Sequence, residues 1–195
     1  MERLKELFKS PLTAINKAKR EKNTNKTLLI LILTWILFGL SFFIIVIKTS
    51  TIILISVGTA MSVFLLGFLA SIFCAYLIET IMNILGGRGK YYEGLTSLTY
   101  AAFPISLGFL ITALLSLIHP LLGIIGFIVV AITVALGLSI YFKSIKELFG
   151  TDMITTLIGF LIIVYVFAIS VYAIVILSAS QFLPIFKELT VASTV

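Results

Sequence analysis

The sequence predicts an all-α membrane protein: a five-transmembrane-helix bundle with an N-terminal amphipathic interfacial helix. Of the 195 residues, 61% are hydrophobic and only 11% are charged, whereas soluble domains are about 45–50% apolar and about 25% charged. The apolar runs are unbroken and too long for strands. Too few polar residues remain to cover a surface in water, so most of the chain is expected to face lipid.

The amino-terminal segment, residues 1–26, is basic and amphipathic. It holds eight of the 14 basic residues and three acids. Its apolar residues recur every three or four positions, as on one side of a helix; they are Leu4, Leu7, Phe8, Leu12, Ile15 and Ala18. We expect a helix lying flat on the membrane, broken at Ser10 and Pro11, which suit an N-cap and a first helical position. The alternative is a solvated basic tail that only sets orientation.

Anionic lipid headgroups are the partner that this segment predicts. Its cations adjoin the first apolar run, which favours headgroups over nucleic acid. Lysines would face the headgroups, and leucines would lie beneath them.

Five apolar runs are long enough to span a bilayer, which takes about 20 residues. They cover residues 27–47, 52–78, 95–118, 121–142 and 155–177. We expect Thr24 or Asn25 to cap the first helix, the double glycine at Gly86 and Gly87 to stop the second, and Pro104 to kink the third. The runs form one transmembrane domain, residues 27–183, which contains a polar loop at residues 143–152. Residues 184–195 form a short tail.

The distribution of basic residues predicts the orientation. If the amino end, the loop with Arg88 and Lys90, and loop 143–152 share one side, twelve of the 14 basic residues lie there. The other side holds Lys48 and Lys187. Because basic residues favour the cytoplasmic side, we expect a multi-pass protein of the cell membrane with a cytoplasmic amino end and an extracytoplasmic carboxyl end.

Small residues at four-residue spacing predict where helices touch. Such stripes occur on the second, third and fourth runs: Gly67, Ser71 and Ala75; Gly108, Thr112 and Ser116; Ala131, Ala135 and Ser139. These three spans are expected to form the packed centre, and homo-oligomers are a further use of such stripes.

Residue patterns for catalysis or metal binding are missing from the sequence. Cys74 is the single cysteine and lies in an apolar run, so neither an intrachain disulfide nor a thiolate metal cluster can form. The single histidine, His119, has no carboxylate near it in sequence, and no phosphate loop or metal-spaced pair occurs. We therefore expect no enzyme, no cofactor and no metal.

Charged residues, glycines and tyrosines are concentrated in the stretch from Glu79 to Pro104, between long apolar segments. Its candidate functional residues are Glu79, Gly86, Gly87, Arg88, Gly89, Lys90, Glu93 and Pro104. Charged side chains at or inside the membrane boundary have a high free energy unless they are paired or hydrated. We expect Glu93 to pair with Arg88 or Lys90. One interpretation is a polar site at the cytoplasmic mouth for a partner protein, a lipid head or an ion. The other is a helix end whose charges lie among headgroups.

Two alternative functions depend on the same residues. A small transporter or channel would use Glu79, Arg88 and Lys90 as a polar site, but the other four spans carry no interior charge, which ion pathways usually need. An intramembrane enzyme would require a site built on Glu79.

The glycine pair followed by GRGKYYEGLTSLTYAAFP, with KSIKELFGTD further on, resembles the YIP family, the Rab/Ypt-GTPase-interacting membrane proteins. The likeness covers residues 27–177 and rests on Gly86, Gly87, Gly89, Lys90, residues 100–102 and Pro104. It implies a non-catalytic five-span bundle; eukaryotic relatives organise vesicle traffic and membrane shape, and bind small GTPases and one another. Glu79 is similar in position to an acidic residue important in some relatives. The long cytoplasmic segment with an acidic-tyrosine-glycine-proline motif is lacking, and this brevity predicts a bacterial or archaeal member.

Overall fold

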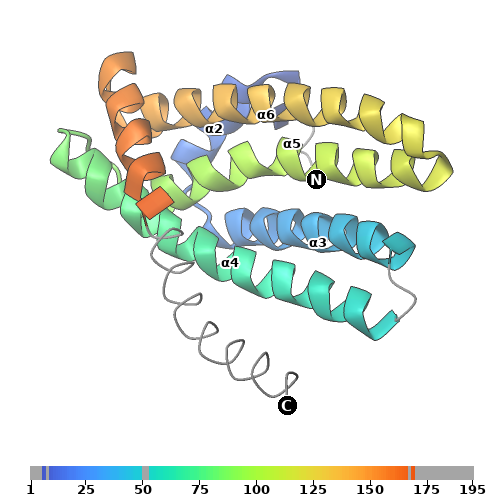
Figure 1. Cartoon of the computed structure of the whole chain (residues 1–195). Helices are drawn as coiled ribbons and strands as arrows, with labels where there is room; N and C mark the ends of the chain where they lie inside the picture. Colours follow the sequence, from blue (N-terminus) through green and yellow to red (C-terminus); the bar gives the residue numbers. More distant parts are fainter. Residues whose placement is uncertain (1–5, 8, 50–52, 167, 170–195) are drawn as a thin grey trace, which may run out of the picture.

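The protein is a helical membrane protein, seen here in a computed structural model that describes residues 6, 7, 9–49, 53–166, 168 and 169. The described part contains no strand. Its helices are α2 (Pro11–Glu21), α3 (Thr24–Thr49), α4 (Ile53–Ile84), α5 (Tyr91–Ile118) and α6 (Pro120–Phe149), followed by a shorter apolar helix, Met153–Val166. Four helices, α3 to α6, are long and apolar enough to cross a membrane. Figure 1 shows them packed side by side.

Helix α5 is the central element, because it contacts α3, α4 and α6 (Figure 1). Glycines let the backbones approach: a Cβ at Gly94 would lie 2.6 Å from the carbonyl oxygen of Ala75 in α4, and one at Gly137 of α6 would lie 2.6 Å from that of Ala101. Both distances are shorter than a carbon–oxygen contact allows, so only glycine fits at these crossings.

The predicted small-residue stripes lie at helix contacts on α4 and α5 but not on α6. The predicted packed centre of the second, third and fourth runs was wrong, because α3 packs against both α4 and α5. Gly67 and Ser71 of α4 contact Trp35 of α3, whose ring nitrogen donates to the Ser71 hydroxyl at 2.8 Å. Thr112 of α5 donates to the carbonyl of Gly126 at 2.8 Å. On α6, however, Ala131, Ala135 and Ser139 are exposed, and the packed face is formed by Gly126, Thr133 and Gly137. Residue size alone did not reveal which side of α6 faces α5.

The predicted polar loop 143–152 is mostly helix, which corrects the sequence-based boundary. Helix α6 continues to Phe149, because Ile145, Leu148 and Phe149 lie on one buried side and extend its apolar face. The helix ends only where Gly150 takes a positive φ of 68°. Lys143 and Lys146 are exposed on the opposite face.

Other boundaries shift by a few residues. Asn23, rather than Thr24 or Asn25, caps α3, since its side-chain oxygen accepts from the Lys26 amide at 3.1 Å. Helix α5 starts at Tyr91 and continues through Pro104. Of the predicted fifth span, 155–177, the described part is helical, whereas residues 167 and 170–177 and the tail 184–195 lie outside the described residues.

Candidate functional site

The end of α4 and the glycine-rich loop after it form the first part of the site. Gly86 has a φ of 93° and donates to the carbonyl of Asn83 at 3.2 Å, and Gly87 donates to that of Met82 at 2.8 Å. These two bonds are the Schellman pattern that closes a helix with a left-handed residue. The double glycine therefore stops α4, as the sequence predicted.

The same loop packs against the end of α6. The Arg88 amide donates to the carbonyl of Phe149 at 3.0 Å. Gly89 is buried, and a Cβ there would lie 2.2 Å from the Phe149 ring. Gly87 is nearly as confined, with Met82 and Thr151 beside it. The loop thus connects α4, α5 and α6 through backbone contacts that larger residues would disrupt.

Glu93 is the most buried acidic side chain among the described residues, with 5% of the residue exposed. It stands at the third position of α5 and accepts from the Lys90 amide at 3.0 Å, which satisfies a donor that the helix start leaves free. Its other oxygen lies 3.6 Å from the ammonium of Lys22. The predicted pairing with Arg88 or Lys90 was wrong, because the nearest cation comes from a distant part of the chain.

Helix α2 brings that cation to the site. Ala14, Ile15 and Ala18 have no exposed surface and join a cluster of buried residues that includes Ile145 and Phe149 at the end of α6. The Tyr92 hydroxyl donates to the carbonyl of Ala18 at 3.2 Å, and Lys19 donates to that of Glu147. Helix α2 begins at Pro11 after Ser10, as predicted. Its buried residues contact protein, whereas the sequence had placed its apolar stripe against lipid.

The outward face of α2 is mostly polar and cationic, with Leu12 as an exposed apolar residue on it. Lys9, Lys19 and Arg20 are exposed around this segment. A shallow hollow of about 610 Å³ is lined by Glu6, Thr13, Asn16, Lys17, Arg20 and Glu21. Within it, Lys17 lies 2.9 Å from Glu6, so positive and negative groups alternate.

The remaining predicted site residues lie apart from this junction or contribute only backbone atoms. Arg88 and Lys90 are exposed, Glu79 is half-buried on α4, and no contact found in the described residues joins Glu79 to either cation. Pro104 lies about 16 Å beyond Glu93 along α5 at 1.5 Å per residue. In the part of the chain that the structure describes, no three His, Cys, Asp or Glu residues are grouped to hold a metal.

Sequence reasoning missed two members of the site, Lys22 and Phe149. Both are close to it only because α2 and α6 end at the same side of the bundle as the loop. We name the group formed by Lys22, residues 86–90, Glu93 and Phe149 the glycine-loop junction. Its contacts suit it to hold helices together, and its exposed cations suit it to face anionic groups.

A match to a protein-family model assigns the chain to a family. The Yip1 domain matches residues 5–183, almost the whole length. The chain belongs to the Yip1 family. No curated protein and no solved structure matches it. In this Yip1 domain the glycines that carried the resemblance, Gly86, Gly87 and Gly89, are those that end α4 and admit Phe149. The family assignment also makes the chain a multi-pass membrane protein.

Proposed function

We propose that this Yip1 protein organises membranes, without catalysis, through its N-terminal segment and by binding partner proteins or further copies of itself at the cytoplasmic face. The observation that carries the proposal is the docked helix α2. Ala14, Ile15 and Ala18 are buried against α6, whereas Lys9, Lys19 and Arg20 are left exposed beside the membrane-spanning bundle. A cationic surface held at this place attracts anionic headgroups, by about 1 kcal/mol for each basic residue near the surface.

The topology that we propose has five spans, an amino end in the cytoplasm and a carboxyl end outside. The arrangement of the junction supports it: α2, the loop with Arg88 and Lys90, and the end of α6 with Lys143 and Lys146 meet at one end of the bundle. The segments richest in basic residues therefore share a side, as the positive-inside rule requires. A reporter fused after Val195 should be active only outside the cytoplasm, and cytoplasmic activity would reject five spans in this orientation.

Lipid binding and membrane shaping are tested together. We would reconstitute the full chain into vesicles with and without anionic phospholipid and measure vesicle diameter and protein clustering by electron cryomicroscopy. Clustering and deformation should require anionic lipid and should weaken at high salt, because screening shortens the reach of exposed charges. The variant with Lys9→Gln and Arg20→Gln should lose most of the effect.

The matched control carries Lys143→Gln and Lys146→Gln, which remove the same charge from α6 on the same side. It should retain most of the deformation. If wild-type protein left vesicles of every composition unchanged, or if both double variants behaved alike, the role given to the N-terminal segment would be wrong.

A further inference from the structure

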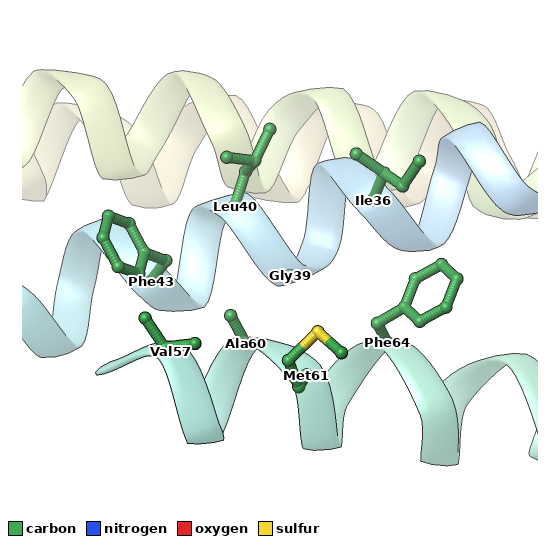
Figure 2. A pocket seen from close by; sticks show the side chains of 8 residues that line it. All are labelled: Ile36, Gly39, Leu40, Phe43, Val57, Ala60, Met61 and Phe64. Atoms are coloured by element: carbon green, nitrogen blue, oxygen red, sulfur yellow. The ribbon is translucent and has the colours of Figure 1, made fainter. Parts of the chain in front are cut away.

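Two hollows in the described part of the chain differ in what they can recognise. The hollow between α3 and α4, shown in Figure 2, is lined by eight residues without a polar side chain, so nothing in it distinguishes one hydrocarbon from another. The hollow on the outward face of α2, here called the polar hollow, is lined by Glu6, Thr13, Asn16, Lys17, Arg20 and Glu21. Its volume of about 610 Å³ is within the range of small-molecule pockets, about 300–1,000 Å³.

Residues of both charges line the polar hollow. The five from Thr13 to Glu21 recur at helical spacing, which places them on one side of α2. Glu6 joins them from the segment before α2. The two carboxylates and the two cations cancel in formal charge. A ligand with a net charge of either sign would therefore meet groups that repel it as well as groups that attract it.

Glu6 has a hydrogen-bond acceptor that the described chain does not use. Its Oε1 accepts from the Lys17 ammonium at 2.9 Å, whereas its Oε2 is buried and has no hydrogen-bond partner. A carboxylate oxygen withdrawn from water is unfavourable until a donor reaches it. Because the terminal torsion of a glutamate is broad, a small rotation of the carboxylate turns this oxygen toward the hollow that Glu6 lines. The ligand that fits here carries an N–H or O–H donor.

Arg20 has the complementary unused group. It is exposed, and none of the ion pairs and hydrogen bonds found among the described residues involves its guanidinium. It stands about one turn beyond Lys17, on the same side of α2. A guanidinium binds phosphate through two parallel hydrogen bonds and keeps its charge at physiological pH. The ligand that fits here therefore also carries an oxyanion, and a phosphate matches the guanidinium best.

A phosphate ester of a primary amine meets both requirements. Its ammonium has three N–H donors, as that of lysine does, and its phosphate accepts from Arg20. A quaternary ammonium has no donor for Glu6. A phosphate without an ammonium brings uncompensated negative charge to Glu6 and Glu21.

The place of α2 favours a membrane source for this ester. Helix α2 packs on α6, which is long and apolar enough to cross a membrane, and Leu12 is exposed on the outward face. A helix that presents basic and apolar side chains together beside a bilayer lies at the level of the headgroups. We propose that the polar hollow binds the headgroup of phosphatidylethanolamine, with the ammonium at Glu6 and the phosphate at Arg20.

This proposal goes beyond the attraction to anionic membranes proposed above. Attraction to anionic membranes predicts when vesicles deform, whereas the polar hollow predicts which lipid the chain retains. Because the two measurements differ, either proposal can fail without the other.

The test measures lipid selectivity. We would purify the full chain in mild detergent, add equal amounts of phosphatidylethanolamine, phosphatidylcholine and phosphatidylglycerol with identical acyl chains, and count bound lipids by native mass spectrometry. Wild type should retain phosphatidylethanolamine about tenfold over each of the others, since choline has no donor and phosphatidylglycerol has a net negative charge. Stepwise N-methylation of the ethanolamine should lower retention by the wild-type chain as N–H donors are replaced. This second measurement needs no variant, so it stays decisive if a substitution prevents folding.

Two pairs of variants separate the two contacts. Glu6→Gln removes the charge that attracts the ammonium and should lower the preference for phosphatidylethanolamine over phosphatidylcholine to about threefold or less. Glu147→Gln, which removes the same charge from the end of α6 outside the hollow, should leave that preference unchanged. Arg20→Gln should lower retention of both lipids alike, because both carry the phosphate. Arg88→Gln, at an exposed position in the glycine-rich loop, should not.

Free O-phosphoethanolamine has the same polar groups without acyl chains and distinguishes the source of the ligand. It should compete only in large excess, because the acyl chains hold the lipid in the micelle beside the hollow. Equal affinity for the free ester would assign the hollow to a soluble ligand and overturn the membrane source.

Three other results would overturn the site itself. The first is equal retention of phosphatidylethanolamine and phosphatidylcholine by the wild-type chain. The second is equal selectivity in Glu6→Gln and Glu147→Gln. The third is a wild-type dimer that binds no lipid and dissociates in Arg20→Gln, which would assign the hollow to a second copy of the chain.

Discussion

The ammonium of Lys22 lies 3.6 Å from the carboxylate of Glu93 and joins the end of α2 to the start of α5. The two side chains differ in burial, since that of Lys22 is 63% exposed and that of Glu93 only 7%. A half-exposed ion pair adds little by itself. Glu93 contributes more through the amide of Lys90, which it caps.

Removing the Glu93 side chain should therefore destabilise the junction. We expect Glu93→Ala to lower the free energy of unfolding by about 1–2 kcal/mol, the cost of a lost cap and an unsatisfied donor. Glu93→Gln should lose less, because its amide oxygen still accepts from Lys90. Equilibrium unfolding in mixed micelles containing dodecyl sulfate, followed by Trp35 fluorescence, measures both. Glu79→Gln is the control for the loss of one negative charge, and an effect there as large as in Glu93→Ala would contradict the assignment.

A side chain at Gly89 should destabilise the protein. The Cβ of Gly89→Ala would meet the Phe149 ring at 2.2 Å, and such overpacking costs about 1–3 kcal/mol. Gly58→Ala is the matched control, because nothing lies within 4 Å of its Cβ and it stands inside α4. There alanine should be neutral or stabilising by about 0.5–1 kcal/mol through helix propensity. The same unfolding assay compares them, and combining Gly89→Ala with Phe149→Leu should be less costly than the sum of the two.

The docking of α2 can be read from cysteine reactivity. In a Cys74→Ala background, Ala18→Cys should react with a membrane-impermeant maleimide about tenfold more slowly than Asn16→Cys, which corresponds to a local opening free energy of about 1.4 kcal/mol. The reason is burial: Ala18 has no exposed surface, and Asn16 points outward. Equal rates would show that α2 leaves α6 freely. Tyr92→Phe should raise only the Ala18→Cys rate, since it deletes the hydrogen bond to that turn.

The helix after α6 should fray in acid. Asp152 accepts from the Thr155 amide at 2.7 Å, and hydrogen bonds from Thr155 hold the pKa of its carboxyl below the ordinary value. A lowered folded-state pKa means that the ionised cap stabilises the helix above the unfolded pKa, about 3.9, and that this contribution is lost as the pH falls through the folded pKa. Hydrogen exchange of the Thr155 amide should accelerate there relative to a neighbouring helix. Asp152→Asn should abolish this pH dependence, and an unchanged profile would contradict it.

The apolar runs were sufficient to predict that the chain lies in a membrane and that its helices are long. The glycine pair was sufficient to predict that α4 ends after Ile84. Helix length follows from bilayer thickness, and a left-handed residue after a helix favours glycine wherever it occurs. The same reasoning located the start of α2 at Pro11. It also singled out Gly86, Gly87, Gly89 and Glu93, since charges and glycines between apolar runs stand out in composition.

Tertiary structure decided which surfaces these elements share. No periodicity showed that the end of α6 would remain helical beneath α2, that the packed side of α6 carries Gly137 rather than Ala135, or that Glu93 would meet Lys22. Each outcome depends on how helices distant in sequence pack against one another. Sequence spacing determines which residues share a face of one helix, but only the competition among all faces for burial selects the neighbour that each face meets.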